Sequence, residues 1–194
     1  RQQFGINVSV LQADITKKES IDKIDAYLRE NNLLLDAVVF NAGLTCRDSF
    51  EDLSLADWER VFFANVHFPV FLLQRIVQLI NKGGSVVFTG SLMGIQPHSV
   101  SLAYGVTKSA VHALVKNMVK FVTPYELRVN AVAPGFVDTE WQKTKPADDT
   151  EHGQHMHLPE HIDKFHFGDG RRLKPALVRL CGRHFAQHCF FDQT

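Results

Sequence analysis

Apolar and polar residues along most of the chain follow two alternating patterns. Short runs rich in Val, Ile, Leu and Phe predict β-strands at Ile6–Gln12, Leu33–Phe40, Ser85–Thr89 and Arg128–Ala133. The run at Leu33–Phe40 is continuous rather than alternating, which is typical of a strand buried on both faces. The stretches between these runs place apolar residues at helical spacing instead.

The helical stretches also carry start and stop signals. Thr16 followed by Glu19 predicts a capping box, and Ser54 with Asp57 predicts a second helix N-terminus. Two further helices are expected at Asn65–Asn81, ended by Lys82-Gly83-Gly84, and at Tyr104–Val122, closed by Pro124.

Strands that alternate with helices predict an α/β fold with a parallel sheet and helices on both of its faces. Ligands of such sheets bind beyond the carboxyl ends of the strands. Asp14, Asn41, Ser91 and Pro134 each follow a predicted strand. We therefore expect these four residues to line one edge of the sheet and to share one site.

Composition narrows the classes of function. The 194 residues suit one domain, and 21 basic against 21 acidic residues give no net charge to attract nucleic acid or anionic lipid. No apolar run is expected to cross a membrane, and no leader segment is recognised. Three scattered cysteines predict no disulfide framework, so a cytoplasmic location is expected. Cys46 is interpreted as a bystander rather than a reactive thiol.

Three polar residues suggest a proton-transfer site. Tyr104 and Lys108 lie four residues apart, so on a helix they share one face. A free phenol has a pKa of about 10, and a nearby ammonium favours the phenolate, so we expect Lys108 to lower the pKa of Tyr104. Ser91, from another segment, can hold a substrate oxygen. His98 and His112 flank this segment and are expected to be surface histidines.

Further matches occur in a fixed order along the chain. The Asn41-Ala42-Gly43 triplet, the Asn65, Ser91, Tyr104 and Lys108 set, and the P-G-x-x-x-T segment from Pro134 to Thr139 all resemble the short-chain dehydrogenase/reductase (SDR) family. The resemblance covers roughly Ile6 to Glu140. It implies a Rossmann-like fold and an enzyme that interconverts a secondary alcohol and a ketone with NAD or NADP.

The resemblance also implies roles for individual residues. Tyr104 would be the general acid or base, Lys108 would lower its pKa and bind the nicotinamide ribose, and Ser91 would orient the substrate oxygen. Asn65 would hold a water that links Lys108 to solvent; a helix cap or a local backbone bond is the simpler alternative for this residue. The implied cofactor-binding residues are Asp14, Ile15, Asn41, Ala42, Gly43, Tyr104, Lys108, Pro134, Gly135, Val137 and Thr139.

The chain departs from the family pattern at both ends. No G-x-x-x-G-x-G turn precedes Asp14, so the first strand-helix-strand unit of the doubly wound sheet is expected to be missing. We therefore divide the chain into a partial Rossmann-like domain, residues 1–140, and a substrate-loop region with an atypical tail, residues 141–194. That tail is interpreted as disordered or frame-shifted. Its histidines, including His152, His155, His157 and His161, are not expected to bind a metal.

Three functional classes stay open from the sequence. The first is the NAD(P)-dependent oxidoreductase, with a small-molecule substrate and a homodimer or tetramer as the full-length form. The second is a non-catalytic SDR fragment without the phosphate-binding turn. The third is a nucleotide-sugar enzyme of the extended SDR branch, against which the Asn-Ala-Gly and P-G-x-x-x-T segments argue.

Overall fold

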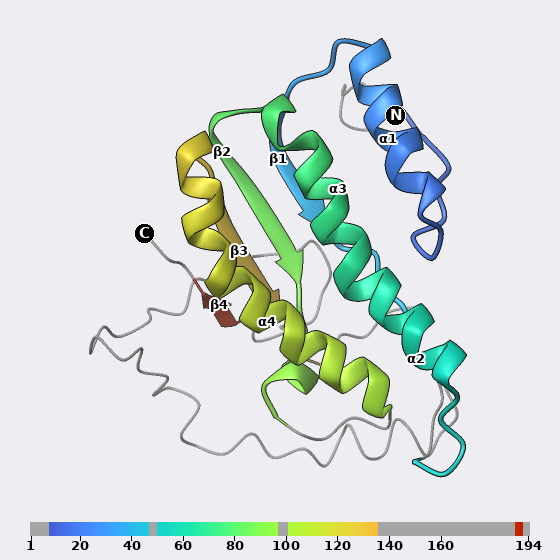
Figure 1. Cartoon of the computed structure of the whole chain (residues 1–194). Coiled ribbons are helices and arrows are strands. Elements are labelled where there is room, and N and C mark those ends of the chain that lie inside the picture. The colour runs from blue at the N-terminus through green and yellow to red at the C-terminus, as the bar shows by residue number, and fades with distance from the viewer. Residues whose placement is uncertain (1–7, 47–49, 97–100, 136–188, 192–194) are drawn as a thin grey trace, which may run out of the picture.

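A four-stranded sheet forms the centre of the protein in the computed structural model, which describes residues 8–46, 50–96, 101–135 and 189–191. Strands β1 (Leu35–Phe40), β2 (Ile80–Thr89) and β3 (Arg128–Ala133) are parallel, and β4 (Cys189–Phe191) pairs antiparallel with β3. The order is β1-β2-β3-β4, as Figure 1 shows. The α/β prediction is thus confirmed, with three of the four expected strands present.

Helices connect the parallel strands. Helix α1 (Glu19–Glu30) precedes β1, and α4 (Leu102–Val122) joins β2 to β3. Between β1 and β2, α2 (Leu55–Phe62) continues through a π-helical turn (Phe63–His67) into α3 (Phe68–Ile76). Short 3₁₀ turns follow at Val77–Leu79, Leu92–Gly94 and Thr123–Tyr125.

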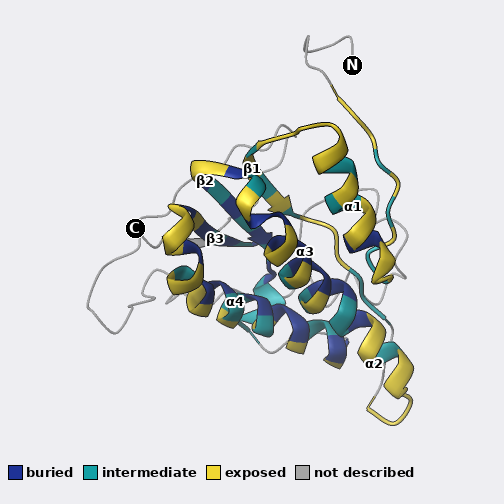
Figure 2. Ribbon diagram, turned by 45° about the horizontal axis from the view of Figure 1, so that its top comes forward, coloured by how far each residue is buried: buried dark blue, intermediate teal, exposed yellow. Residues whose placement is uncertain are grey.

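The core lies between the sheet and one layer of helices. Val38, Val86 and Val129 are in register on neighbouring strands, so their side chains point to the same face of the sheet. Val86 and Val129 pack with α3 and α4, and Val38 also packs with residues of α1 and α3. Helices α3 and α4 therefore cover one face, with their buried sides toward the strands in Figure 2, and α1 packs beside α3.

Strand β1 is more exposed than the sequence predicts. Its residues are intermediate or exposed, and Val39 is 61% accessible. Among the described residues only β2 pairs with β1, so β1 is an edge strand with one free row of peptide groups. The prediction that this segment is buried on both faces was wrong, because the described helices cover the face toward which Val38 points and Val39 points to the opposite face.

The first predicted strand also differs. Of Ile6–Gln12, residues 8–12 are described and form no strand. An extended segment needs a neighbouring strand to complete its ladder of hydrogen bonds. The outer edge of β1 has no strand beside it among the described residues, which leaves Val8–Gln12 without that support.

The helix boundaries shift for local reasons. The capping box at Thr16 does not form, because the Thr16 hydroxyl donates to the Asp14 carboxylate at 2.8 Å and α1 begins only at Glu19. The helix expected to reach Asn81 ends at Leu79 instead, and β2 begins at Ile80. Ser54 caps α2 as predicted, and Ser101 caps α4.

One helical stretch contradicts the expectation that no segment could span a membrane. In the described part of the chain, the helical stretch Leu55–Leu79 is long and apolar enough to cross a membrane by length and composition alone. However, 50% of its most apolar window is buried inside the fold. Core helices pass the same test, so this stretch is a weak indication of a membrane span.

Candidate active site

The site begins where β2 ends. Backbone hydrogen bonds between β2 and the β3 segment continue beyond Thr89, the last residue of β2. The Gly90 amide donates to the Val132 carbonyl at 2.8 Å, and the Leu92 amide donates to the Pro134 carbonyl at 2.9 Å. Ser91 lies between these two bonds in an extended conformation and is 7% exposed. Its backbone is therefore held by the edge of the sheet.

Tyr104 faces Ser91 from the first turn of α4. The Ser101 hydroxyl accepts the Tyr104 amide at 3.2 Å and caps the helix there. The Tyr104 side chain is intermediate in exposure and hydrogen bonds with the Ser91 side chain. The structure thus brings together a phenol and a hydroxyl from two distant segments, as the sequence predicts.

Burial raises the pKa of Tyr104 above its usual value, and the hydrogen bond from Ser91 opposes this shift only in part. Desolvation disfavours the phenolate. The expected lowering of this pKa by Lys108 was therefore wrong for the chain as it stands. The buried setting keeps Tyr104 in its protonated form at neutral pH.

Lys108 lies one helical turn beyond Tyr104 and is 5% exposed. Its Nζ atom donates to the Thr89 carbonyl at 2.7 Å and lies 5.5 Å from the centre of the Tyr104 ring. Burial lowers the pKa of Lys108 to about 8. The ammonium is thus anchored at the end of β2, beside the phenol that it was expected to influence.

Asn65 joins the site through the π-helical turn. Its side chain reaches Leu44, where Nδ2 donates to the carbonyl at 2.8 Å and Oδ1 accepts the amide at 2.7 Å. Nδ2 also donates to the Thr107 hydroxyl at 2.9 Å, and that hydroxyl donates to the Tyr104 carbonyl at 2.8 Å. Asn65 therefore ties the loop after β1 to α4, and both amide protons of its side chain are used within the protein.

Gly43 lies between Asn65 and Lys108. A Cβ atom at this position would lie 3.4 Å from both Asn65 Oδ1 and Lys108 Nζ. A side chain at this position would therefore press against both polar groups.

The remaining residues of the predicted cofactor set are spread along the same edge. Asn41 Oδ1 accepts the Thr89 hydroxyl at 2.9 Å and so ties β1 to β2. Ile15, Asn41 and Ala42 line an apolar hollow of about 370 Å³ beside β1. Asp14 accepts hydrogen bonds from the Thr16 amide and hydroxyl, which lower the pKa of its carboxyl group.

The last part of the predicted set is described only in part. The Pro134 carbonyl accepts the Leu92 amide, and Gly135 lies beside Leu92, whose Cδ2 atom would be 3.7 Å from an added Cβ. Val137 and Thr139 lie outside the described residues, as do His98 and the histidines between 152 and 161.

The sequence interpretation missed His112. This residue is not the expected surface histidine: its Nε2 atom lies 3.0 Å from the Ser91 carbonyl oxygen, and burial lowers the pKa of its imidazole. The spacing of 104, 108 and 112 places all three residues on one face of a helix, and this signal could have found it.

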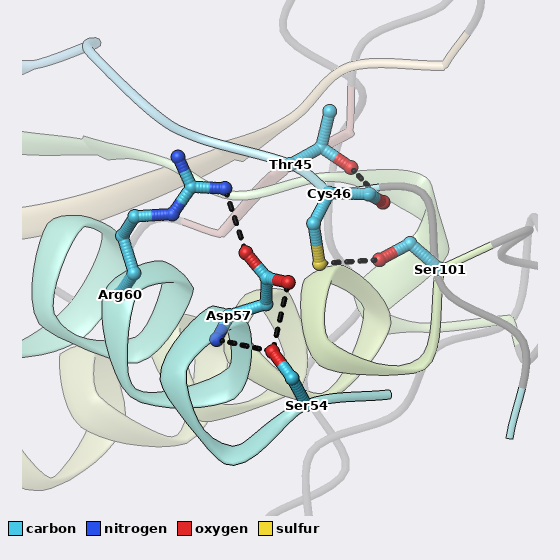
Figure 3. A network of polar contacts seen from close by, with 6 residues as sticks. All are labelled: Thr45, Cys46, Ser54, Asp57, Arg60 and Ser101. Atoms are coloured by element: carbon cyan, nitrogen blue, oxygen red, sulfur yellow. Dashed lines mark hydrogen bonds and ion pairs between the residues drawn. The ribbon is translucent and has the colours of Figure 1, made fainter. Parts of the chain in front are cut away.

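A second polar contact links the loop after β1 to the start of α4. Figure 3 shows the Cys46 sulfur turned toward the Ser101 hydroxyl, and the two atoms are 3.8 Å apart. The N-terminus of α2 lies nearby, where Asp57 accepts from Ser54 at 2.9 Å and from Arg60 at 2.9 Å. Cys46 thus contacts the residue that caps the helix bearing Tyr104.

Comparison with known proteins identifies the class to which this fold and site belong. Residues 1–150 match the family model for short chain dehydrogenases. The chain is therefore a member of the short-chain dehydrogenase/reductase family, and its Rossmann-like fold follows from that membership.

Two curated relatives illustrate the family. The oxidoreductase YmfI of Bacillus subtilis is 33% identical over 140 residues, which are 71% of this chain and 57% of the relative. The 3-oxoacyl-[acyl-carrier-protein] reductase FabG of Aquifex aeolicus is 30% identical over 142 residues, or 71% of this chain and 56% of the relative. The chain thus spans little more than half the length of these relatives.

Solved structures of short-chain dehydrogenases also superpose on this chain. A short-chain dehydrogenase/reductase from Serratia marcescens superposes with a TM-score of 0.63 at 30% identity, covering 68% of this chain and 54% of that one. A short chain dehydrogenase from Burkholderia cenocepacia in complex with NADP gives a TM-score of 0.62 at 27% identity, covering 67% and 54%.

Proposed function

We propose that the chain carries the catalytic residues of an NAD(P)-dependent oxidoreductase that interconverts a secondary alcohol and a ketone by Ser-Tyr-Lys chemistry. The observation that carries this proposal is the position of Tyr104. Its phenol meets the Ser91 side chain and lies one turn from the Lys108 ammonium, in a partly buried setting.

The protonation states suit Tyr104 as a proton donor. Because burial raises its pKa, the phenol keeps its proton at neutral pH and can give it to the oxygen of a ketone. The developing phenolate would be stabilised by the Lys108 ammonium and the Ser91 hydroxyl. In the oxidation direction the phenolate would take the proton of the alcohol, which a high pKa makes harder near neutrality.

Ser91 is suited to hold the substrate oxygen. Its Oγ atom accepts the Met93 amide at 3.1 Å, which fixes the position of the hydroxyl. A serine hydroxyl has one proton to donate and two lone pairs, so it can accept from Met93 while its proton turns from Tyr104 to a substrate oxygen. Pre-positioned donors of this kind stabilise charge that develops during a reaction.

The residues present fit one end of a nicotinamide cofactor. Lys108 and Gly43 would hold the ribose, and Asn41, Ala42, Asp14 and Ile15 would contact the remainder, with Tyr104, Pro134, Gly135, Val137 and Thr139 near the nicotinamide. When bound, NAD or NADP supplies or accepts the hydride. The Burkholderia cenocepacia neighbour was solved with NADP and a 4-hydroxyisoleucine dehydrogenase with NADH, which supports this cofactor class.

The same proposal assigns the rest of the chain. Residues 1–140 would form the partial Rossmann-like domain, and residues 141–194 would form the substrate-loop region and an atypical tail, of which Cys189–Phe191 joins the sheet as β4. The substrate would be a small alcohol or carbonyl compound, and the partner neither a nucleic acid nor a membrane. The enzyme would work in the cytoplasm as a homodimer or tetramer.

A second candidate function is that of a non-catalytic SDR chain. It is supported by the pKa of Tyr104, which burial raises above its usual value, because a phenol that holds its proton this firmly is a poor base. In that case Ser91, Tyr104 and Lys108 would remain in place without turning over a substrate.

Cofactor titration separates the two proposals. NADH and NADPH are added to the purified chain while their fluorescence is followed, with the Lys108→Met chain as the matched control. The enzymatic proposal expects saturable binding that Lys108→Met weakens, and ketone reduction that Tyr104→Phe abolishes while binding remains. A folded chain that binds neither nucleotide would support the non-catalytic alternative.

A further inference from the structure

His112 is the third residue of one stripe along α4. Tyr104, Lys108 and His112 are each four residues apart, and all three reach the segment at the end of β2. Tyr104 bonds with the Ser91 side chain, Lys108 with the Thr89 carbonyl, and His112 with the Ser91 backbone. The first two belong to the proposed chemistry, whereas the third has no role in it so far.

The contact between His112 and Ser91 has a defined direction. Nε2 lies 3.0 Å from the Ser91 carbonyl oxygen and 3.4 Å from the Ser91 amide nitrogen. One ring nitrogen cannot donate to the carbonyl and accept the amide at the same time. The shorter contact favours the tautomer in which Nε2 carries the proton and donates it to the carbonyl.

Gly90 makes room for this arrangement. A Cβ atom at Gly90 would lie 2.4 Å from Cε1 and 2.7 Å from Nε2 of His112, and 3.0 Å from the Val132 carbonyl oxygen. The imidazole therefore packs directly on the backbone next to Ser91. Any side chain at position 90 would push the ring away from the carbonyl that it binds.

Ser91 is thus held from several directions. The amides of Gly90 and Leu92 bond to β3 and to Pro134, and the Met93 amide bonds to Ser91 Oγ. The Ser91 carbonyl and the Leu92 amide belong to one planar peptide group, and the carbonyl accepts the Gly94 amide at 3.0 Å as well as bonding His112. Pro134, Gly94 and His112 therefore hold this group together, and His112 is the partner that acts through its side chain. Its bond limits the tilt of the peptide group that follows the Ser91 Cα atom, from which Oγ is carried.

The charge state of His112 suits such a role. Burial lowers the pKa of its imidazole, the bond to the Ser91 backbone raises it, and the charges of Lys108 and Lys116 lower it further. The ring is therefore neutral at neutral pH. A neutral imidazole can donate from Nε2 without placing a second positive charge beside Lys108.

We propose that His112 is a positioning residue for Ser91: its Nε2–H group binds the Ser91 carbonyl and so sets the Ser91 hydroxyl against Tyr104. The catalytic consequence rests on the proposed function. The positioning itself does not, because it can be measured in a chain that turns over no substrate.

The test compares amide hydrogen exchange at two residues. The Met93 amide depends on Ser91 Oγ, whereas the Gly90 amide depends on Val132 and belongs to a different peptide group from the Ser91 carbonyl, so Gly90 reports on the strand end alone. In His112→Leu we expect the Met93 amide to exchange about ten-fold faster and the Gly90 amide to stay unchanged, as expected for the loss of one hydrogen bond.

Two polar variants separate positioning from packing. The Gln side chain places its amide nitrogen where Nε2 lies, and Asn is one methylene shorter, so His112→Gln should restore slow exchange of Met93 and His112→Asn should not. If Met93 and Gly90 change together, or if Asn rescues as well as Gln, His112 is only a packing residue and the proposal fails.

A kinetic measurement then tests the catalytic consequence. In an active chain, His112→Leu should lower kcat toward the value of Ser91→Ala with unchanged NADPH affinity, and His112→Gln should recover it. If no form of the chain turns over a ketone, the proposed function fails while the exchange data still decide the position of Ser91. If exchange responds as expected but kcat does not, the catalytic consequence is refuted.

Discussion

Lys108 Nζ donates to the Thr89 carbonyl at 2.7 Å, so the helix that carries Tyr104 is bonded directly to the last residue of β2. The bond runs from a buried ammonium to a backbone oxygen, and burial lowers the pKa of this lysine. A charge held in this way is costly to bury, and the cost depends on pH.

The first prediction follows from that cost. Burial lowers the pKa of Lys108 from 10.5 to about 8, which corresponds to roughly 3 kcal/mol between the two protonation states. Between these two values the unfolded chain binds the proton and the folded chain does not, so the Lys108 contribution to the free energy of unfolding should rise with pH.

Urea unfolding from pH 7 to pH 9.5 measures this effect. The stability of the unchanged chain relative to Lys108→Met should increase over this range by about 1–2 kcal/mol. Lys116→Met is the control, since its exposed side chain keeps its hydration in the fold. A stability difference independent of pH would contradict the prediction.

Ser91→Ala tests the proposed oxygen-binding hydroxyl. Removing one pre-positioned donor typically lowers kcat by about 10²–10³, and we expect a loss of that size for ketone reduction with NADPH affinity preserved. Ser109→Ala, on the same helix as Tyr104 but exposed, should retain nearly full activity. Equal losses in both variants would argue against a specific role for Ser91.

Asn65→Ala should weaken the fold more than an ordinary polar substitution. It removes three hydrogen bonds and leaves the amide and carbonyl of Leu44 without this partner, while the Thr107 hydroxyl keeps its bond to the Tyr104 carbonyl. An unsatisfied group costs about 1–3 kcal/mol, and the two Leu44 groups are only partly buried, so a total loss of roughly 2–4 kcal/mol is expected. Asn81→Ala, which removes an exposed bond to Asp36, should cost less than about 1 kcal/mol. Thermal unfolding of the two variants gives the comparison.

Gly94→Ala should displace the turn after Ser91 from α4. The added Cβ would lie 2.5 Å from the Lys108 carbonyl carbon and 2.7 Å from the Ser109 amide nitrogen, both of which are helix backbone and cannot move aside. Overpacking of this kind costs about 1–3 kcal/mol. At Gly135 the nearest atom would be 3.7 Å away, so Gly135→Ala should be tolerated. Similar unfolding midpoints for both variants would refute the close packing.

The sequence predicted those parts of the fold that depend on local pattern. Periodicity located α1, α2 and α4, and strand ends located Asn41 and Ser91 at a common edge. The motif order identified the family because its residues occupy fixed places between those elements. Thr107 and the Thr89 carbonyl could not be predicted, since their importance arises only where distant segments meet.

Other features could not be obtained from pattern because they depend on neighbours. Val39 belongs to an apolar run that suggests burial, yet the exposure of its side chain depends on whether a helix covers that face of the sheet. The pKa of Tyr104 depends on desolvation as well as on nearby charge. The spacing of Tyr104 and Lys108 indicates that an ammonium is near, but it does not indicate how far the phenol is buried. His112 was misjudged because histidine is common on surfaces, although its helical phase with Tyr104 and Lys108 was visible.

The π-helical turn at Phe63–His67 lies in an otherwise regular helix from Leu55 to Ile76. Such a turn accommodates one extra residue within an α-helix, so the faces of α2 and α3 on either side keep their orientation toward the core. A chain shortened by one residue here could close up into an uninterrupted α-helix and still pack, but Asn65 would rotate away from Leu44. Loss of the π-helical turn would therefore remove the hydrogen bonds between Asn65 and Leu44 while the fold remained.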